Sequence, residues 1–194
     1  MKKLASFVLF VVLFFLCGAN LVACDSSNSS IKNSNTTQTL ETKVWEMSFY
    51  VDEFQNPTNE AYIKNSDVFV GVFTNSATTN SKLYARILID ADDIAIKLWE
   101  YGSYEVKAYS TTYYDITLLD DNGNKHNING TMYKNGDRIR LADLTFISLL
   151  QKNQKLKIYI KENSEYGYNS TYIFEVKNGN FNNVYSSFYN SYIK

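Results

Sequence analysis

Regular alternation between apolar and polar residues governs the chain from residue 44 onward. Residues 45–52 (WEMSFYVD) carry an apolar side chain at every second position, and residues 83–89 and 94–98 repeat the pattern on either side of the acidic segment 90–93. Because successive side chains of a strand point to opposite faces, this period of two predicts half-buried β-strands. Similar runs predict further strands over residues 104–109, 113–119, 125–133, 138–141, 156–161 and 170–176.

Residues 67–74 are apolar on both faces, which favours a central strand with Gly71 at a bulge or a close approach of two strands. Four of the eight glycines directly follow asparagine, at positions 123, 130, 136 and 179. Asn-Gly pairs suit type I′ hairpin turns, because both residues tolerate positive φ angles. We therefore predict a mostly β fold, either an antiparallel β-sandwich or a barrel-like sheet. Pro57 is interpreted as a loop after the first strand.

Two segments favour helices instead. Asp143 can cap a short internal helix from Leu144 to Lys152, in which Leu144, Ile147 and Leu150 share one face. From residue 180 onward, apolar residues follow one another at helical spacing: Phe181, Val184, Tyr185, Phe188 and Tyr192. This spacing predicts a C-terminal helix whose apolar face docks on the sheet.

The N-terminus has the pattern of a secretory signal. Lys2 and Lys3 precede a run over residues 4–16 in which only Ser6 is polar, and this run is shorter than the ~20 residues needed to span a bilayer. The segment that follows, Leu21-Val22-Ala23-Cys24, resembles the lipobox of bacterial lipoproteins. The resemblance implies that residues 1–23 are removed as a signal peptide and that Cys24 carries lipid, as palmitate and a diacylglycerol. The alternative is a hydrophobic N-terminal helix that is never cleaved.

The resemblance also implies a domain organisation and a location. Residues 24–43 comprise the lipidated Cys24 and a linker so rich in Ser, Asn and Thr that we expect it to be flexible. Residues 44–194 then form a single β-rich domain. We expect the protein to be lipid-anchored on the extracytoplasmic side of a bacterial cell membrane. Asp25, directly after the cysteine, resembles the enterobacterial signal for retention at the inner membrane, but that rule does not hold in every lineage, so the choice between inner and outer membrane stays open.

Several classes of function find little support. A formal net charge of −1 without a basic block argues against a nucleic-acid partner. The loop at residues 120–124 departs from calcium-binding loops, because Lys125 stands where such a loop requires glycine. His126 is the sole imidazole, and no G-x-S-x-G motif accompanies it. We therefore expect no metal site and no cofactor, and an enzyme is the less favoured class.

Two polar stretches are candidate recognition surfaces. Residues 101–114 combine five tyrosines with Ser, Thr and Gly, a composition typical of binding surfaces, although tyrosine is also a common strand residue. Tyr114 shares a face with Ile116 and Leu118, so Tyr109 and Tyr113 are expected to be the exposed ones. Residues 75–81 are interpreted as a polar loop that either rings a small ligand or satisfies its own backbone. The candidate binding residues are Tyr101, Tyr104, Tyr109, Tyr113, Asn75, Ser76 and Thr78.

Residues 75–81, together with 50–54 and 57–58, are similar to a pattern in uncharacterised bacterial envelope proteins, a resemblance that implies no activity. The combined features favour a membrane-anchored envelope lipoprotein with a binding or interaction ectodomain. Its partner beyond membrane lipid is an envelope protein or a saccharide. Two alternatives stay open: an envelope hydrolase that uses Asp or Glu carboxylates, and an inhibitor or exclusion factor that docks on another envelope protein.

Overall fold

Eight antiparallel strands close into a barrel in the computed structural model, which describes residues 43–163 and 169–192. Around the barrel the order is β4-β3-β11-β10-β7-β8-β9-β5, and β5 pairs with β4 to close the ring. These strands are β3 (Phe69–Asn75), β4 (Thr78–Ile89), β5 (Ile94–Glu100), β7 (Thr112–Leu119), β8 (Lys125–Met132), β9 (Ile139–Leu141), β10 (Lys155–Asn163) and β11 (Thr171–Lys177). The mostly β fold is confirmed, and the barrel is the correct one of the two predicted architectures.

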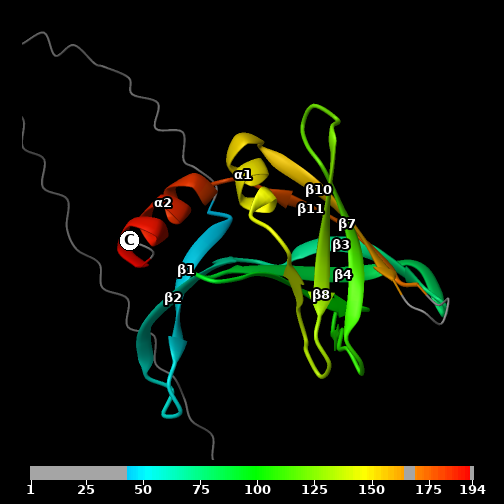
Figure 1. Ribbon diagram of the computed structural model, residues 1–194, viewed down its shortest axis with the longest axis horizontal. Coiled ribbons are helices and arrows are strands. Elements are labelled where there is room, and N and C mark those ends of the chain that lie inside the picture. Colours follow the sequence, from blue (N-terminus) through cyan, green and yellow to red (C-terminus); the bar gives the residue numbers. More distant parts are fainter. Residues whose placement is uncertain (1–42, 164–168, 193–194) are drawn as a thin grey trace, which may run out of the picture. The chain divides into compact units, whose positions relative to one another are not determined.

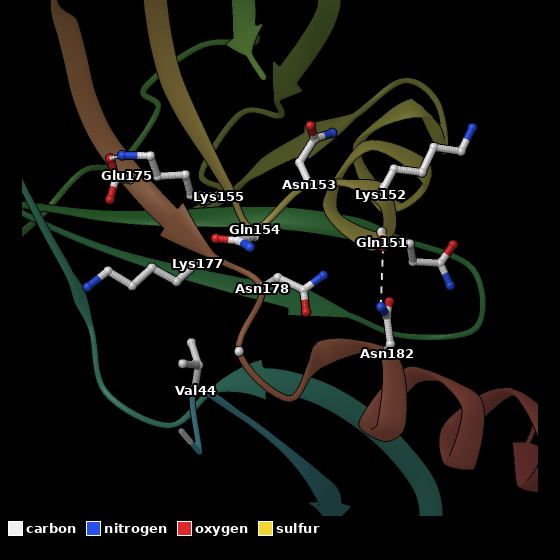
Figure 2. A pocket seen from close by; sticks show the side chains of 11 residues that line it. Val44, Gln151, Lys152, Asn153, Gln154, Lys155, Glu175, Lys177, Asn178 and Asn182 are labelled. Atoms are coloured by element: carbon white, nitrogen blue, oxygen red, sulfur yellow. Dashed lines mark hydrogen bonds and ion pairs between the residues drawn. The ribbon is translucent and has the colours of Figure 1, made fainter. Parts of the chain in front are cut away.

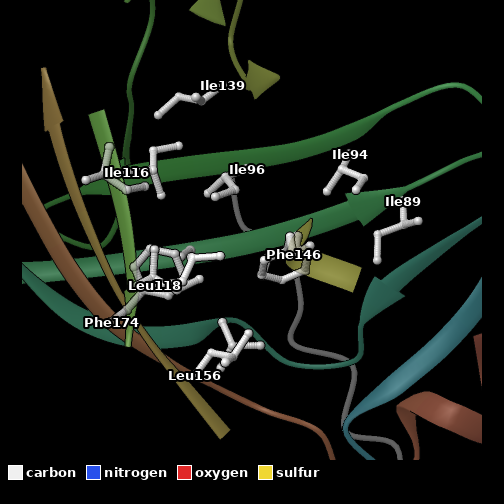
Figure 3. Close-up of a cluster of buried hydrophobic side chains, with 14 of the residues drawn as sticks. Ile89, Ile94, Ile96, Ile116, Leu118, Ile139, Phe146, Leu156 and Phe174 are labelled. Carbon is white, nitrogen blue, oxygen red and sulfur yellow. The ribbon is translucent and has the colours of Figure 1, made fainter. Parts of the chain in front are cut away.

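The interior of the barrel is filled by the inward-facing residues that the period of two predicts. On β7, Ile116 and Leu118 are buried, while Asp115, the residue just before Ile116, faces solvent. Figure 3 shows how side chains from several strands meet Phe146 in one apolar cluster. The labelled members are Ile89, Ile94, Ile96, Ile116, Leu118, Ile139, Phe146, Leu156 and Phe174.

A short helix closes one end of this barrel. Helix α1 (Thr145–Lys152) buries Phe146, Ile147, Leu149 and Leu150, and the chain passes directly from it into β10. The prediction for its first residue was wrong, because Leu144 lies outside the helix and is exposed rather than on the buried face.

The remaining strands extend the sheet beyond the barrel. β1 (Trp45–Val51) and β2 (Pro57–Asn65) form a hairpin that joins β4 through the pair Ile63–Ile89, and the two-residue β6 (Tyr104–Glu105) pairs with β5. Helix α2 (Phe181–Tyr192) lies against this hairpin, as Figure 1 shows, so the predicted docking of the C-terminal helix on the sheet is confirmed. All described residues belong to one compact unit, Thr39–Lys194.

The side-chain amide of Asn65 replaces missing strand–strand hydrogen bonds at the point where the β1–β2 hairpin leaves the barrel. β4 pairs with β3 along its first part and with β2 at Leu88 and Ile89, which leaves a gap between the two partners. Asn65 fills this gap: its Oδ1 accepts the backbone N–H of Ile87 at 2.7 Å, and its Nδ2 lies 3.5 Å from the carbonyl of Ala85. Asn65 is completely buried, and these bonds supply the ladder contacts that the missing strand would have made.

The interpretation of Pro57 as a loop was wrong, because Pro57 is the first residue of β2. A proline is tolerated there, since the first residue of a strand need not donate to the ladder. The predicted strand over residues 104–109 was also wrong in extent, because only Tyr104 and Glu105 pair with β5. The loop predicted over residues 75–81 is mostly strand, because β4 already begins at Thr78.

The predicted Asn-Gly turns were wrong in detail. None of the four pairs, all within the described residues, has positive φ at both positions, and Asn129-Gly130 lies inside β8. Two consecutive positive φ angles fall instead at Tyr101-Gly102, in the three-residue connection between β5 and β6. The close approach expected at Gly71 is confirmed, because a Cβ there would lie 2.1 Å from the carbonyl oxygen of Ile173 on β11.

Candidate functional site

The end of the barrel opposite α1 contains a cavity of about 800 Å³. It is surrounded by the ends of β3, β5 and β10 and by the first residues of β7 and β11, so segments far apart in the sequence meet there. An eight-stranded barrel has an interior just wide enough to be filled by side chains or to hold one small ligand. Its lining is Asn75, Ser76, Glu100, Tyr104, Glu105, Val106, Lys107, Ala108, Tyr109, Ser110, Thr111, Thr112, Tyr113, Tyr114, Glu162, Asn163, Ser170 and Tyr172, called the mouth cavity below.

Glu100, the last residue of β5, places a carboxylate in the mouth cavity. Its Oε1 accepts a hydrogen bond from the Tyr172 hydroxyl at 3.2 Å, and its Oε2 accepts one from Asn75 Nδ2 at 3.2 Å. Burial raises the pKa of the Glu100 carboxyl, the two hydrogen bonds oppose this rise, and the nearby charge of Glu162 adds to it. The ionised form of Glu100 is therefore costly in this site.

A second carboxylate comes from β10. Glu162 Oε2 accepts the backbone N–H of Ser170 at 3.2 Å, which links β10 to the start of β11. Neither Glu162 nor Glu100 forms an ion pair with any cation in the described part of the chain. The mouth cavity thus holds two carboxylates without a counter-ion from residues 43–163 and 169–192.

Two tyrosines on the inner face of the barrel lie beside these carboxylates. Tyr172 is 2% exposed and Tyr114 is 3% exposed. Burial raises the pKa of Tyr114, and the charges of Glu162 and Glu100 raise it further. The three side chains line the same cavity. The Tyr172 hydroxyl binds Glu100, but the Tyr114 hydroxyl has no hydrogen-bond partner among the described residues. The hydroxyl is not among the fully buried unpartnered atoms of the described residues, so it is open to the space of the cavity and free to bond to a molecule there.

The edge of the mouth cavity carries an ion-pair network. Glu105 accepts hydrogen bonds from Lys97 and Lys107, and these bonds lower the pKa of its carboxyl. The Lys107 Nζ lies 3.0 Å from Glu105 Oε2, so the one lysine of the lining is already engaged by a carboxylate. Lys97 also contacts Asp137, which ties the β5–β6 hairpin to the loop before β9.

The structure brings five of the seven predicted binding residues to this cavity: Asn75, Ser76, Tyr104, Tyr109 and Tyr113. Tyr113 on β7 is 61% exposed, as the strand parity predicts. Tyr109 is 93% exposed as expected, but it lies outside any strand, so its exposure does not follow from parity. The other two lie outside the lining. Tyr101 packs edge-on against Phe73, with ring centroids 4.9 Å apart, and Thr78 bonds to the hydroxyl of Ser81.

Glu100, Glu162 and Tyr172 were missed by sequence reasoning, and Tyr114 was assigned only to the buried face. Their common signal is a polar group in phase with the inward-facing residues at the end of a strand. Tyr114 and Tyr172 continue the buried series of β7 and β11. The sequence gives no indication that Tyr172 meets Glu100, because 72 residues separate them.

A second hollow of about 800 Å³ lies between α1, the β10–β11 pair and the start of α2 (Figure 2). Its polar side chains hold these elements together. Asn182 Nδ2 donates to the carbonyl of Gln151 at 3.2 Å, as the dashed line in Figure 2 shows, and Lys155 Nζ lies 3.2 Å from Glu175. These groups are already paired, so this hollow is a weaker candidate site than the mouth cavity.

The other polar groups that the sequence singled out have structural partners. Asp120 accepts hydrogen bonds from the backbone of Asn122 and Asn124, and His126 Nε2 lies 3.1 Å from its Oδ2. The hydrogen bond with His126 is the largest cause that lowers the pKa of Asp120, to about 2. These bonds build the tip of the β7–β8 hairpin.

Residues 43–163 and 169–192 contain no group of three or more His, Cys, Asp or Glu side chains placed to hold a metal ion. In the same ranges no helix has the length and apolar character needed to cross a membrane. Cys24, the signal segment 1–23 and the linker up to residue 42 lie outside the described residues. Comparison of the chain with protein-family models, with curated proteins and with solved structures finds no match.

Proposed function

We propose that the protein is a lipid-anchored binding protein of the bacterial envelope that holds a small polar molecule in the mouth cavity. The lipobox-like segment ending at Cys24 supports the anchor. The observation that carries the binding role is the hydroxyl of Tyr114, a residue only 3% exposed: it has no hydrogen-bond partner among the described residues, and it lines, together with two carboxylates, a cavity of about 800 Å³. Small-molecule sites have volumes of roughly 300 to 1,000 Å³ and a few convergent polar groups, and mouths of β-barrels are common places for them.

The character of the lining supports a small molecule rather than a large flat partner. The polar groups at the floor, Glu100, Glu162, Tyr114 and Tyr172, converge from four different strands. A ligand that enters this site would contact all four strands at once, which gives specificity through a small number of placed groups. The exposed Tyr109 and Tyr113 at the edge add rigid aromatic contact area at low entropic cost.

The binding role is tested by blocking the cavity. Thr112 lies in the lining, on the inward-facing parity of β7, so Thr112→Trp is expected to fill the mouth. Thr117 lies on the outward parity of the same strand, and Thr117→Trp is the matched control. Native mass spectrometry of the protein extracted from its own membranes is expected to show a bound small molecule in wild type and in the control. The same occupancy in Thr112→Trp, or no bound molecule in wild type, would contradict the proposal.

The anchor is tested separately. The full chain is expected in the membrane fraction, and Cys24→Ala is expected to abolish acylation, cleavage before residue 24 and the lipid anchor together. Two acyl chains each contribute ~0.8 kcal/mol per buried CH₂, which is sufficient for stable anchoring. Intact mass of the purified protein should show an acylated fragment that begins at Cys24. A wild-type protein without lipid at Cys24 would refute the anchor and leave the cavity assay unaffected.

A hydrolase is the second candidate, because the fold brings Glu100 and Glu162 into one cavity. Glycosidases use a pair of carboxyl groups, one of which is kept protonated by a raised pKa. Burial raises the pKa of Glu100 in this direction. Release of the chromophore from aryl glycosides by wild type, with loss of release in Glu100→Gln and Glu162→Gln, would favour hydrolysis. Binding without turnover would favour the binding protein.

A further inference from the structure

The polar groups deep in the mouth cavity include two carboxylates with unused hydrogen-bond acceptor sites. Glu100 and Glu162 are acceptors when ionised, and each carboxylate has about four lone-pair sites. Glu100 uses two of them for Tyr172 and Asn75, and Glu162 uses one for the Ser170 backbone. The Tyr114 hydroxyl, which can accept as well as donate, is a further polar group without a partner among the described residues. A ligand that satisfies the free carboxylate lone pairs must bring donors.

Charge imposes a second condition. Burial raises the pKa of Glu100, and the charge of Glu162 raises it further. The described residues supply no cation to either of them, and Lys107 in the lining is paired with Glu105. An anionic ligand would be repelled in this partly buried site, whereas a cation would supply the missing counter-charge.

Aromatic rings at the edge of the cavity meet a third condition. Tyr104, Tyr109 and Tyr113 line the cavity and remain largely exposed. The faces of aromatic rings attract ammonium groups, and this attraction strengthens where water is excluded. The combination of acceptors, uncompensated negative charge and tyrosine rings suits an ammonium group, which has several N–H donors and no acceptor.

We propose that the mouth cavity binds an organic ammonium ion, such as a primary amine or a polyamine, through Glu100, Glu162 and Tyr114. The inference rests on the proposed function, since it names the ligand class of that same cavity. The ammonium N–H groups bond to the free carboxylate lone pairs and to the Tyr114 oxygen. The alkyl part of the ligand lies toward the tyrosine rings.

The test compares three molecules of the same carbon length on the full chain in non-ionic detergent. Putrescine carries two ammonium groups, 1,4-butanediol replaces them with hydroxyls, and succinate replaces them with carboxylates. Isothermal titration calorimetry is expected to detect binding of putrescine and not of the other two. Binding of 1,4-butanediol or succinate as tight as that of putrescine, or no binding of putrescine at millimolar concentration, would overturn the inference.

Variants then locate the site. Glu100→Gln and Glu162→Gln keep the size and the hydrogen-bonding oxygen, and each is expected to weaken putrescine binding by about tenfold or more, as for loss of a charged hydrogen-bond partner. Glu60→Gln removes the same charge from an exposed position on β2, outside the cavity, and is expected to leave the affinity unchanged. An equal loss in Glu60→Gln would mean that putrescine responds only to the overall charge, which refutes the site.

The outcomes separate this inference from the proposed function. If native mass spectrometry finds a neutral or anionic molecule that Thr112→Trp excludes, the cavity is a binding site and the ammonium inference fails. If neither that assay nor the amine titration detects a ligand, both fail. Melting temperatures of all variants show whether a lost affinity reflects a lost fold, and the two glutamine variants provide independent readings.

Discussion

The unpartnered hydroxyl of Tyr114 gives a paired test of stability. Tyr114→Phe and Tyr172→Phe each remove one oxygen from a side chain that is at most 3% exposed. The Tyr172 hydroxyl donates to Glu100 at 3.2 Å, so its removal deprives a partly buried carboxylate of a donor. A hydrogen bond to a charged group contributes about 1.5 to 3 kcal/mol, and the long distance favours the lower end. We expect Tyr172→Phe to lower the free energy of unfolding by about 1 to 2 kcal/mol.

Tyr114→Phe is expected to behave in the opposite way. Because no described residue accepts or donates a bond at the Tyr114 hydroxyl, its removal leaves no partner unpaired. The free energy of unfolding should stay unchanged or rise by up to about 1 kcal/mol. Urea denaturation followed by circular dichroism measures both variants, and a change of 1 kcal/mol corresponds to roughly 2 to 4 °C in melting temperature for a chain of this size.

Equal losses of stability in the two variants would refute this reasoning. If Tyr114→Phe loses as much stability as Tyr172→Phe, the Tyr114 hydroxyl has a partner in the folded protein, and the account of an unused polar group fails. If Tyr114→Phe keeps its stability and loses putrescine affinity, the hydroxyl serves the ligand rather than the fold.

Three further perturbations test the fold and the electrostatics. Gly71→Ala is expected to cost about 3 kcal/mol in urea denaturation, because its Cβ would lie 2.1 Å from the Ile173 carbonyl oxygen, and wild-type stability would refute this close approach. Asn180→Ala removes hydrogen bonds of 2.9 and 2.8 Å to the backbone N–H groups of Val44 and Trp45, so we expect a loss of about 2 kcal/mol and a red-shifted tryptophan emission, whereas unchanged emission would contradict the link. Because the pKa of Glu100 is raised, its contribution to stability is greatest below the ordinary glutamate pKa and is lost as the pH rises through the raised value. Wild type should therefore lose melting temperature relative to Glu100→Gln as the pH rises. A difference independent of pH would exclude a raised pKa.

The pH dependence of ligand affinity is expected to follow the titratable groups of the mouth cavity. Burial raises the pKa of Glu100, the hydroxyl of Tyr172 and the amide of Asn75 lower it, and the charge of Glu162 adds to the rise. Tyr114 titrates far above neutral pH, because burial raises its pKa. Affinity for an ammonium ion should therefore fall as the pH drops through the raised pKa of Glu100, since the protonated carboxyl has lost its charge.

The alternation of residues was sufficient to predict most of the barrel strands, because one face of each strand must be buried. It failed at β2, where Pro57 and the buried amide of Asn65 break the apolar pattern. Asn65 is inward-facing because it bonds to Ile87, a contact 22 residues away that no local pattern reveals. Strand order was equally inaccessible, since it depends on which edges meet when the barrel closes.

The candidate site was predicted only at its edge. The composition of residues 101–114 directed attention to Tyr109 and Tyr113, and the structure places both in the lining of the mouth cavity. The floor depends on tertiary contacts: Glu100 and Glu162 belong to strands that are not neighbours in the barrel. A carboxylate at the end of an apolar strand is common in sequences. Glu100 becomes part of a candidate site only because the closed barrel places Tyr172 and Glu162 in the same cavity.

Chemical-shift mapping locates the ligand on the barrel. The full chain, labelled with ¹⁵N, is titrated with putrescine in non-ionic detergent. The account predicts that the largest backbone amide shifts cluster at Glu100, Tyr114, Glu162 and Ser170, around the mouth cavity. Shifts centred on the hollow at Asn178 and Asn182, or shifts spread evenly over exposed acidic residues, would contradict the claim that the open end of the barrel is the binding site.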